Sequence, residues 1–343
     1  MGVFDFVTIF RVNTSISIDL GTAHILIYDK QRKKIVLNEP SVVARDRKTG
    51  RLIAVGKEAR EMLGKTPDSI QAIKPLQDGV IADIDSTKEM ITYFIHKIYG
   101  NSLFKPEVMI CVPIEVTSVE RKALFDAVKG AKKTYIIEEG RAAIIGSGVD
   151  ISQPEGSMVI DIGGGSTDIA ILSLDEIIAS KSIRIAGNRF DEDIVRYVKR
   201  KYNLLIGDRT AEKIKKELGS ALKVQSPEVM EIKGRDLETG IPNTVEVNAN
   251  EIYEAIEDSL FQIVNSTKEV LEKCPPELAA DILDNGIVMT GGGSLIRNFI
   301  DMMEKEVGIK VFLSPNPLDS VVLGGGAAFD NKKLLRTLQM KEN

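Results

Sequence analysis

One stretch of sequence decides the fold: residues 159–168, VIDIGGGSTD, in which alternating apolar residues lead into Asp161, three glycines and two hydroxyl side chains. An apolar run, residues 169–172, follows, so the stretch predicts a strand, a glycine turn and a second strand. Residues 17–23, SIDLGTA, repeat the pattern around Asp19 before another apolar run. A chain that builds this hairpin twice is predicted to clamp a polyphosphate from two sides.

Length and composition limit the kind of protein. The 343 residues are enough for about two domains, and 43% hydrophobic with 28% charged residues suits a well-packed chain with a polar surface. The net charge of −5 argues against nucleic acid as the main partner, because phosphate backbones attract basic proteins. Cys111 and Cys274 are expected to be reduced thiols of a cytosolic protein. The sequence has no run of about 18 apolar residues, so we expect no membrane-spanning helix.

Strands alternate with helices along both halves, which predicts an α/β fold with mixed sheets flanked by helices. The halves share one plan, so we expect a duplicated unit with a cleft between the copies. The expected parts are a first domain at 1–150 with a small insert at about 38–75, a second domain at 151–330 with an insert at about 186–248, and a tail at 331–343. In the second insert, the polar stretch 233–248 is expected to be a lobe poor in strands.

Glycines at the ends of strands suit phosphate binding, because they expose backbone N–H groups and let a ligand approach closely. Thr22, Ser166 and Thr167 add hydroxyl donors. Asp19 and Asp161 stand where strands end, and two such carboxylates facing a triphosphate would hold Mg²⁺ mostly through its waters.

A third glycine run, GGGS at residues 291–294, follows an apolar strand and precedes a helix expected from Leu295. This arrangement lets backbone amides meet an anion. Each loop alone could be a tight turn with a capping Asp, but three of them in one chain favour a phosphate site. The run does not match the dinucleotide pattern G-x-G-x-x-G, and the sequence lacks the Walker pattern.

Glu138 and Glu139 end a strand just before a helix. Either carboxylate could orient an attacking water in phosphoryl transfer. The alternative is a helix-start carboxylate that the helix dipole favours without any catalytic role. The residues alone do not decide between these readings.

The N-terminal segment, residues 1–12, is rich in apolar side chains. On a helix, one side would carry Val3, Phe6, Val7, Ile9 and Phe10. Such a pattern is typical of a helix that lies in a membrane interface. A strand extension or a partly disordered leader is the alternative.

Further segments are characteristic of one family. They are residues 37–44 (LNEPSVVA), 62–67 (MLGKTP), 78–83 (DGVIAD), 119–121 (VER), 189–192 (RFDE), 274–279 (CPPELA) and 324–326 (GGG). On these segments the sequence resembles the actin superfamily of ATPases, and within it the MreB family of bacterial actin homologues, over nearly the whole chain. The resemblance implies a duplicated actin/ribonuclease-H-like fold of four subdomains that binds ATP or ADP with Mg²⁺ in a central cleft.

The resemblance also implies roles for single residues. Glu139 matches the glutamate that positions the nucleophilic water, and Ser166 matches the hydroxyl that assists it. The segments 212–215 and 292–295 match those that contact the nucleoside. The expected nucleotide-binding residues are Asp19, Gly21, Thr22, Ala23, His24, Asp161, Gly163, Gly164, Gly165, Ser166, Thr167, Glu212, Lys213, Ile214, Lys215, Gly291, Gly292, Gly293, Ser294 and Leu295.

The resemblance further implies partners and a location. The family forms protofilaments that pair antiparallel, binds the inner face of the cell membrane from the cytoplasm and determines cell shape. Paralogues and morphogenetic membrane proteins are further expected partners, and nucleic acid is not. Leu103 and Phe104 match the family's membrane-inserting loop, with ordinary local packing as the alternative.

The chain departs from the family pattern at three places. His24 stands where the family usually has Asn, Gly140–Arg141 where it has Pro-Met, and Ser166 where it has Thr. Glycine frees the φ angle that proline fixes, and serine lacks the methyl group that restricts threonine's rotamer. We therefore expect slow ATP hydrolysis coupled to polymerisation. The alternatives are a family member specialised for the helicity or motility of wall-less cells, and a sugar-kinase or exopolyphosphatase-type phosphotransferase.

Overall fold

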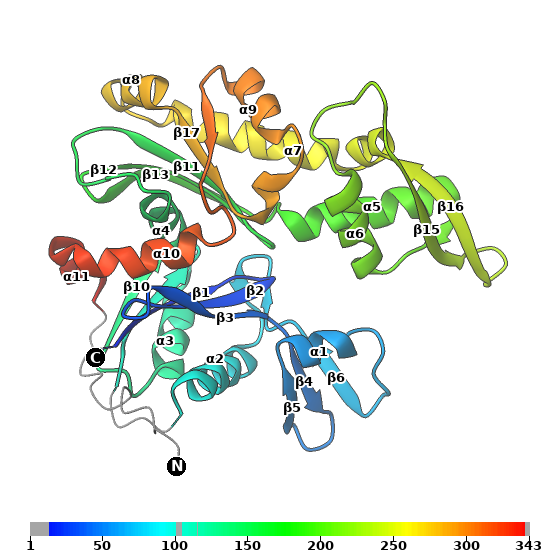
Figure 1. Ribbon diagram of the computed structural model, residues 1–343, viewed down its shortest axis with the longest axis horizontal. Coiled ribbons are helices and arrows are strands. Elements are labelled where there is room, and N and C mark those ends of the chain that lie inside the picture. Colours follow the sequence, from blue (N-terminus) through cyan, green and yellow to red (C-terminus); the bar gives the residue numbers. More distant parts are fainter. Residues whose placement is uncertain (1–13, 101–104, 115, 340–343) are drawn as a thin grey trace, which may run out of the picture. The chain divides into compact units, whose positions relative to one another are not determined.

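The computed structural model describes residues 14–100, 105–114 and 116–339 (Figure 1). The chain divides into two compact units, which we call unit 1 (1–146 with 321–343) and unit 2 (147–320). Residues 321–330, which we expected in the second domain, group with unit 1. The proposed membrane-contacting residues, 1–12 with Leu103 and Phe104, lie outside the described part of the chain.

Unit 1 is built on a five-stranded sheet of order β10-β9-β1-β2-β3. The central strand β1 pairs parallel with β9 on one side and antiparallel with β2 on the other. The strands are β1 (Ser15–Leu20), β2 (His24–Asp29), β3 (Lys34–Pro40), β9 (Glu107–Val112) and β10 (Lys133–Glu138).

Helices cover both faces of this sheet (Figure 1). They are α2 (Ile84–Tyr99), α3 (Ser118–Ala127), α4 (Glu139–Gly146), α10 (Ser320–Ala327), the 3₁₀ turn η3 (Ala328–Asp330) and α11 (Lys332–Leu338). Side chains alternate along β1, so Ile16 and Ile18 enter the core that also holds Phe94 of α2 and Leu124 of α3. Ser17 faces the other way, toward Gly325 of α10.

A smaller sheet of order β5-β4-β6 completes unit 1. Its elements are β4 (Val43–Asp46), β5 (Leu52–Val55), α1 (Lys57–Met62) and β6 (Ile70–Ile73), followed by the short pair β7 (Leu76–Gln77) and β8 (Val80–Ile81). A separate small core of Val42, Ala44, Ala54 and Ala59 holds it together.

Unit 2 repeats the plan of the main sheet, with order β13-β12-β11-β17-β18. Its central strand β11 again pairs antiparallel with the next strand and parallel with a later one. The strands are β11 (Ser157–Ile162), β12 (Thr167–Ser173), β13 (Glu176–Ile183), β17 (Ile287–Thr290) and β18 (Val311–Leu313). The same strand order and directions in both units confirm the predicted duplicated fold.

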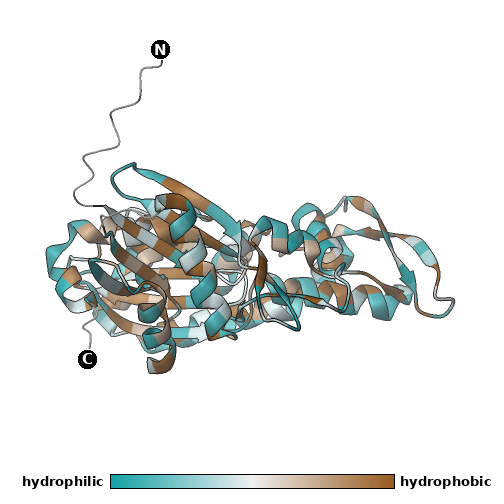
Figure 2. Ribbon diagram, turned by 90° about the horizontal axis from the view of Figure 1, so that it is seen from below, coloured by the Kyte–Doolittle hydropathy of each residue, from teal (hydrophilic) through white to brown (hydrophobic). Residues whose placement is uncertain are grey.

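The helices of unit 2 are α5 (Gly187–Tyr202), α6 (Asp208–Leu218), α7 (Ala249–Glu272), α8 (Pro276–Asn285), the 3₁₀ turn η2 (Gly292–Leu295) and α9 (Phe299–Val307). A capping box formed by Asn248 and Glu251 starts α7, the longest of them. Hydrophobic residues gather along the strands and the inner helix faces (Figure 2). No helix of the described residues is long and apolar enough to span a bilayer.

One expectation about unit 2 was wrong. Residues 233–248 contribute to a long antiparallel hairpin of β15 (Val229–Asp236) and β16 (Pro242–Asn248), with β14 (Leu204–Leu205) beside β15. The ladder runs from the Val229–Asn248 pair to the Arg235–Pro242 pair. Ile232 and Val247 are buried in the core and Met230 and Val245 pack against it, whereas most of the remaining side chains are polar, so the composition of the hairpin resembles that of a loop.

Candidate functional site

The opening hairpin of unit 2 forms a four-residue glycine turn, residues 163–166, between β11 and β12. Gly163 N–H donates to the Ser166 carbonyl at 2.9 Å, which closes the turn. A β-carbon on Gly163 would lie 3.2 Å from that same oxygen, so a larger residue would crowd the turn. Thr167 is fully buried and its hydroxyl donates to the Ile185 carbonyl at 2.6 Å, which ties the turn to the chain that enters α5.

The N-terminus of α5 rests on this turn. Gly187 N–H donates to the Gly163 carbonyl at 3.1 Å, and Asn188 N–H donates to the Gly164 carbonyl at 2.7 Å. A β-carbon on Gly187 would lie 3.4 Å from the Gly163 oxygen and from Lys215 Nζ, which is ordinary van der Waals contact, so Gly187 packs directly against the turn. A helix N-terminus beside a glycine turn concentrates positive potential, which suits a phosphate.

Lys215 brings a cation from α6 to the same place. Its Nζ donates to the Gly187 carbonyl at 2.7 Å and lies 2.9 Å from Asp191 Oδ1. The side chains of Lys215 and Asp191 are only 14% and 15% exposed, so the ion pair is held in one position. Sequence reasoning predicted Lys215 but missed Asp191 and Gly187. The one feature of the sequence that pointed toward Asp191 was the 189–192 segment, which is characteristic of the family; no feature pointed to Gly187.

The third glycine run lies against the end of β11. Strand β17 is parallel to β11 with Thr290 opposite Asp161, so Gly291 follows directly beside that carboxylate. Gly291 has a φ of 80°, and a β-carbon there would lie 2.3 Å from the Ile162 carbonyl oxygen and 2.6 Å from Asp161 Oδ1. Glycine is therefore required. The Asp161 turn and the 291–295 turn form one surface in unit 2.

The helix expected from Leu295 begins later. Residues 292–295 form a 3₁₀ turn, closed by the Ser294 hydroxyl donating to the Gly291 carbonyl at 2.6 Å, and α9 starts at Phe299. Leu295 is 49% exposed, which leaves an apolar side chain at the surface beside the turn.

The expected nucleoside segment 212–215 presents its side chains in different directions. Ile214 is fully buried in the core of unit 2, so its side chain is unavailable to a ligand. Lys213 is exposed and lies 3.9 Å from Glu217. Lys216 Nζ donates to Glu212 Oε1 at 2.7 Å. Of this segment, Lys215 alone approaches the glycine turn within unit 2.

The corresponding turn of unit 1 joins β1 to β2. Leu20 pairs with Ile25, so residues 21–24 make a tight connection after Asp19. Thr22 is buried and its Oγ1 accepts from Gly79 N–H at 3.2 Å, while Ala23 is exposed. His24, at the position where the family usually has Asn, has its Nδ1 2.8 Å from Asn38 Oδ1. The imidazole is thus tied to the neighbouring strand β3.

The two candidate water-positioning carboxylates differ in their surroundings. Glu138 Oε2 lies 3.3 Å from Arg141 Nε, and these side chains are 19% and 7% exposed. Glu139 begins α4 and is 8% exposed. An ion pair with Arg141 engages Glu138, and Glu139 also has an interaction partner.

Within the described residues, no group of three or more His, Cys, Asp or Glu side chains is arranged to hold a metal ion. Asp161 and Asp19 each contribute one carboxylate at the end of a strand. Single carboxylates fit Mg²⁺, which keeps several waters and takes its remaining oxygens from a substrate's phosphates.

Comparison with known proteins identifies the family. The MreB/Mbl protein family model matches residues 13–337. The cell shape-determining protein Mbl of Bacillus subtilis is 49% identical over 319 residues, which cover 92% of this chain and 96% of Mbl.

Solved structures of related proteins support the same family. MreB5 of Spiroplasma citri bound to ADP is 39% identical with a TM-score of 0.88, and covers 94% of this chain and 97% of its own. The same protein bound to AMPPNP gives a TM-score of 0.89 at 38% identity, covering 94% of this chain and 98% of its own. The MamK double helical filament, at 22% identity and a TM-score of 0.79, covers 93% of this chain and 99% of its own and shares the fold. The chain therefore belongs to the MreB/Mbl family and has the actin-like fold.

Proposed function

We propose that this protein is an ATP-binding, filament-forming cytoskeletal protein that attaches to the cytoplasmic membrane and determines cell shape. One observation carries the proposal: the glycine turn 163–166, the N-terminus of α5 and the Lys215 ammonium meet at one place in unit 2. Relatives solved with ADP and AMPPNP, and a relative named for determining cell shape, support it.

In this proposal the glycine turns bind phosphates through backbone N–H groups. Glycine is suited to these positions because it has no side chain to keep the phosphate away from the backbone. Lys215 adds a positive charge that Asp191 and the Gly187 carbonyl hold in place. Asp161 would hold Mg²⁺ through its waters beside the glycine turn of unit 2, Asp19 is the equivalent carboxylate of unit 1, and the ion would offset the charge of the phosphates.

Hydrolysis of the bound ATP would need a residue that orients water toward the γ-phosphorus. We assign this role to Glu139, because it matches the glutamate that positions the nucleophilic water in the family and is largely buried at the start of α4. The water oxygen bonds to phosphorus while the bond to the ADP oxygen breaks, and the released proton passes to solvent or phosphate. Ser166 supplies the assisting hydroxyl. We expect slow turnover because Gly140 loosens the backbone beside Glu139, and misplacement by about 1 Å can cost roughly 100-fold in rate.

Electron microscopy of the protein with ATP, Mg²⁺ and liposomes tests the proposal. The expected result is paired filaments that form with ATP and decorate the liposomes. A fluorescent ATP analogue should bind before any filament appears. Absence of nucleotide binding would overturn the central claim, whereas transfer of phosphate from ATP to a sugar added to the same mixture would support a metabolic enzyme instead.

A further inference from the structure

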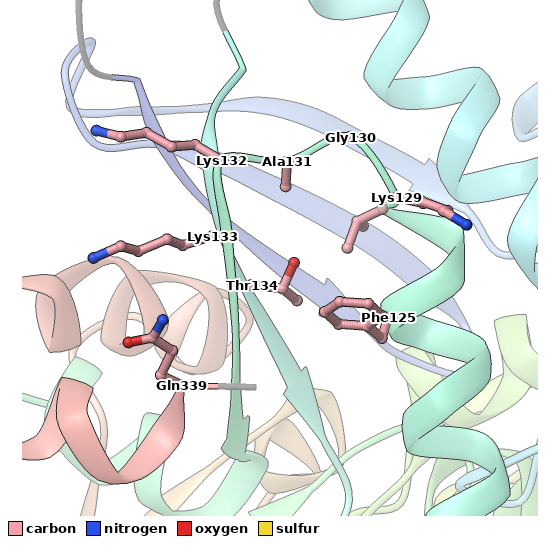
Figure 3. A pocket seen from close by; sticks show the side chains of 9 residues that line it. Phe125, Lys129, Gly130, Ala131, Lys132, Lys133, Thr134 and Gln339 are labelled. Carbon is pink, nitrogen blue, oxygen red and sulfur yellow. The ribbon is translucent and has the colours of Figure 1, made fainter. Parts of the chain in front are cut away.

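A small cavity lies at one end of unit 1, away from the glycine turn of that unit (Figure 3). It has a volume of about 210 Å³ and lies between the end of α3, the turn 128–132 and the start of β10. Phe125 and Thr134 point into it, and Gln339 lies at its edge (Figure 3). The volume is below the roughly 300–1,000 Å³ typical of pockets for drug-sized ligands, so it suits a small polar group.

Three lysines surround the cavity, and we call Lys129, Lys132 and Lys133 the lysine collar. All three are exposed, and their ammonium groups extend to both sides of the cavity (Figure 3). Lys132 lies 3.7 Å from Glu107, which neutralises part of its charge. Within the described part of the chain, Lys129 and Lys133 make no ion pair. The collar is therefore a positive patch on a protein whose net charge is −5.

The collar is remote from the residues assigned to nucleotide chemistry in unit 1. Strands β9 and β10 are parallel, and the ladder runs from the Lys133–Glu107 pair to the Glu138–Val112 pair. Five residues of strand separate Lys133 from Glu138, which is roughly 16 Å at about 3.3 Å per residue. A ligand at the collar leaves Glu139 untouched.

The collar also lies where the chain enters β9. Lys132 N–H donates to the Pro106 carbonyl at 2.8 Å, and Lys105 beside it is exposed. An anionic surface that met this end of unit 1 would meet four lysines. Basic side chains near a membrane are attracted to anionic lipids, and the attraction falls within a Debye length.

We propose that the lysine collar and its cavity bind the phosphate-bearing headgroup of an anionic phospholipid. The lysine side chains, whose ammonium groups point away from Thr134 on opposite sides (Figure 3), turn toward the phosphate, and the Thr134 hydroxyl and Gln339 amide contact the polar part of the headgroup. This inference rests on the membrane attachment proposed above and adds to it the class of lipid and the residues that select it. It makes attachment dependent on lipid charge and on salt.

The experiment is vesicle co-sedimentation of the full chain, with vesicles of phosphatidylcholine alone or with added phosphatidylglycerol. The triple variant Lys129→Gln/Lys132→Gln/Lys133→Gln removes the collar's charge from exposed positions. The matched control Lys199→Gln/Lys233→Gln/Lys273→Gln removes the same charge from exposed positions of unit 2. We expect the collar variant to lose affinity for anionic vesicles by roughly fivefold per lysine, about 100-fold in all, and the control variant to bind as wild type does.

Two further arms identify the ligand. Inorganic phosphate competes for the same ammonium groups, so at constant ionic strength it should release the protein only at concentrations far above that of the anionic lipid. Release by phosphate at the concentration of the lipid would identify free phosphate as the ligand and overturn the lipid proposal. A gel-shift assay with single-stranded DNA should show no collar-dependent binding, and tighter binding to DNA than to vesicles would also overturn it. Thr134→Val should weaken binding to phosphatidylglycerol a few-fold without changing its salt dependence, and unchanged binding would remove the cavity from the proposal.

The outcomes separate this inference from the proposed function. If wild type and the collar variant bind anionic vesicles equally, the proposal that the lysine collar binds the lipid is overturned, and the proposed membrane attachment stands. If wild type binds no vesicle of either kind, membrane attachment fails and the collar fails with it. Nucleotide binding should be the same in both variants, because neither changes a residue of the glycine turns.

Discussion

The guanidinium of Arg141 lies 3.3 Å from the Glu138 carboxylate, and both side chains are largely buried. Arg141→Met removes the cation and leaves the carboxylate without this partner. Breaking a buried pair in this way costs about 3 kcal/mol, because the remaining charge is poorly solvated. Urea denaturation should show the loss, and the double variant Arg141→Met/Glu138→Gln should recover most of it. A single variant as stable as wild type would show that the pair is not a structural anchor of α4.

Restoring the family's residues should speed hydrolysis. Gly140 is the second residue of α4, where proline is compatible with a first helical turn, and Ser166 is buried in the glycine turn. Gly140→Pro with Ser166→Thr should raise phosphate release from polymerised protein about tenfold or more, because the reacting groups are better fixed. Glu139→Gln should abolish most of the release while nucleotide binding persists. If the wild-type protein hydrolyses ATP as fast as other family members, and the double substitution does not raise this rate, the prediction of slow hydrolysis is wrong.

Lys215→Gln should weaken ATP binding. A hydrogen bond to a charged group contributes about 1.5–3 kcal/mol, so the affinity should fall roughly 10- to 100-fold in a titration with a fluorescent ATP analogue. Asp191→Asn should lower affinity less, because the Gly187 carbonyl still holds the ammonium at 2.7 Å. Lys223→Gln, an exposed lysine, is the control and should bind normally. Full affinity in Lys215→Gln would show that the ammonium has no role in binding.

Gly325→Ala should destabilise unit 1. A β-carbon at this position would lie 2.2 Å from Ser17 Oγ and 2.8 Å from Cys111 Sγ, so α10 would have to move away from the sheet. Overpacking of this kind costs about 1–3 kcal/mol in a thermal or urea unfolding experiment. Gly207→Ala is the comparison, since no heavy atom lies within 4 Å of a β-carbon there and the φ of −88° suits alanine; as a change at the N-cap of α6 it should cost no more than about 1 kcal/mol. Equal effects of the two changes would count against tight packing of α10.

The Glu251 carboxylate should stabilise unit 2 at neutral pH, and this contribution to the free energy of unfolding should be lost in acid. Burial raises the pKa of its carboxyl, but hydrogen bonds from Lys201, Tyr202 and the Asn248 N–H outweigh burial and hold it below its ordinary value of 4.5. A depressed pKa contributes stability that is complete above the unfolded value and is lost as pH falls through the folded value. Glu251→Gln should therefore cost about 2–3 kcal/mol near pH 7. The difference from wild type should shrink below pH of about 4.5. A difference independent of pH would exclude the charge as its cause.

The local sequence pattern was enough to predict the glycine turns and the strands that flank them, because each strand–turn–strand pattern can be recognised within about ten residues. The contacts that complete the site were not visible in this way. Lys215 and Gly187 are 28 residues apart, and nothing in the sequence indicates that α6 brings one to the other. Nor could spacing tell Glu138 from Glu139 as the water-positioning residue, and only the match to the family favours Glu139. The β15–β16 hairpin was not predicted because its apolar alternation is short: Met230 and Ile232 on β15 and Val245 and Val247 on β16 are surrounded by charged and polar residues.

The return of residues 321–343 to unit 1 has a consequence for biosynthesis. All of unit 2 leaves the ribosome before α10, which supplies Gly324, Gly325 and Gly326 to contacts with Ala142, Ser17 and Tyr28. Unit 2 can therefore fold co-translationally as a contiguous stretch, whereas unit 1 must wait with one sheet face uncovered until its last helices emerge. That waiting period is when the nascent chain is most exposed to chaperones and to aggregation.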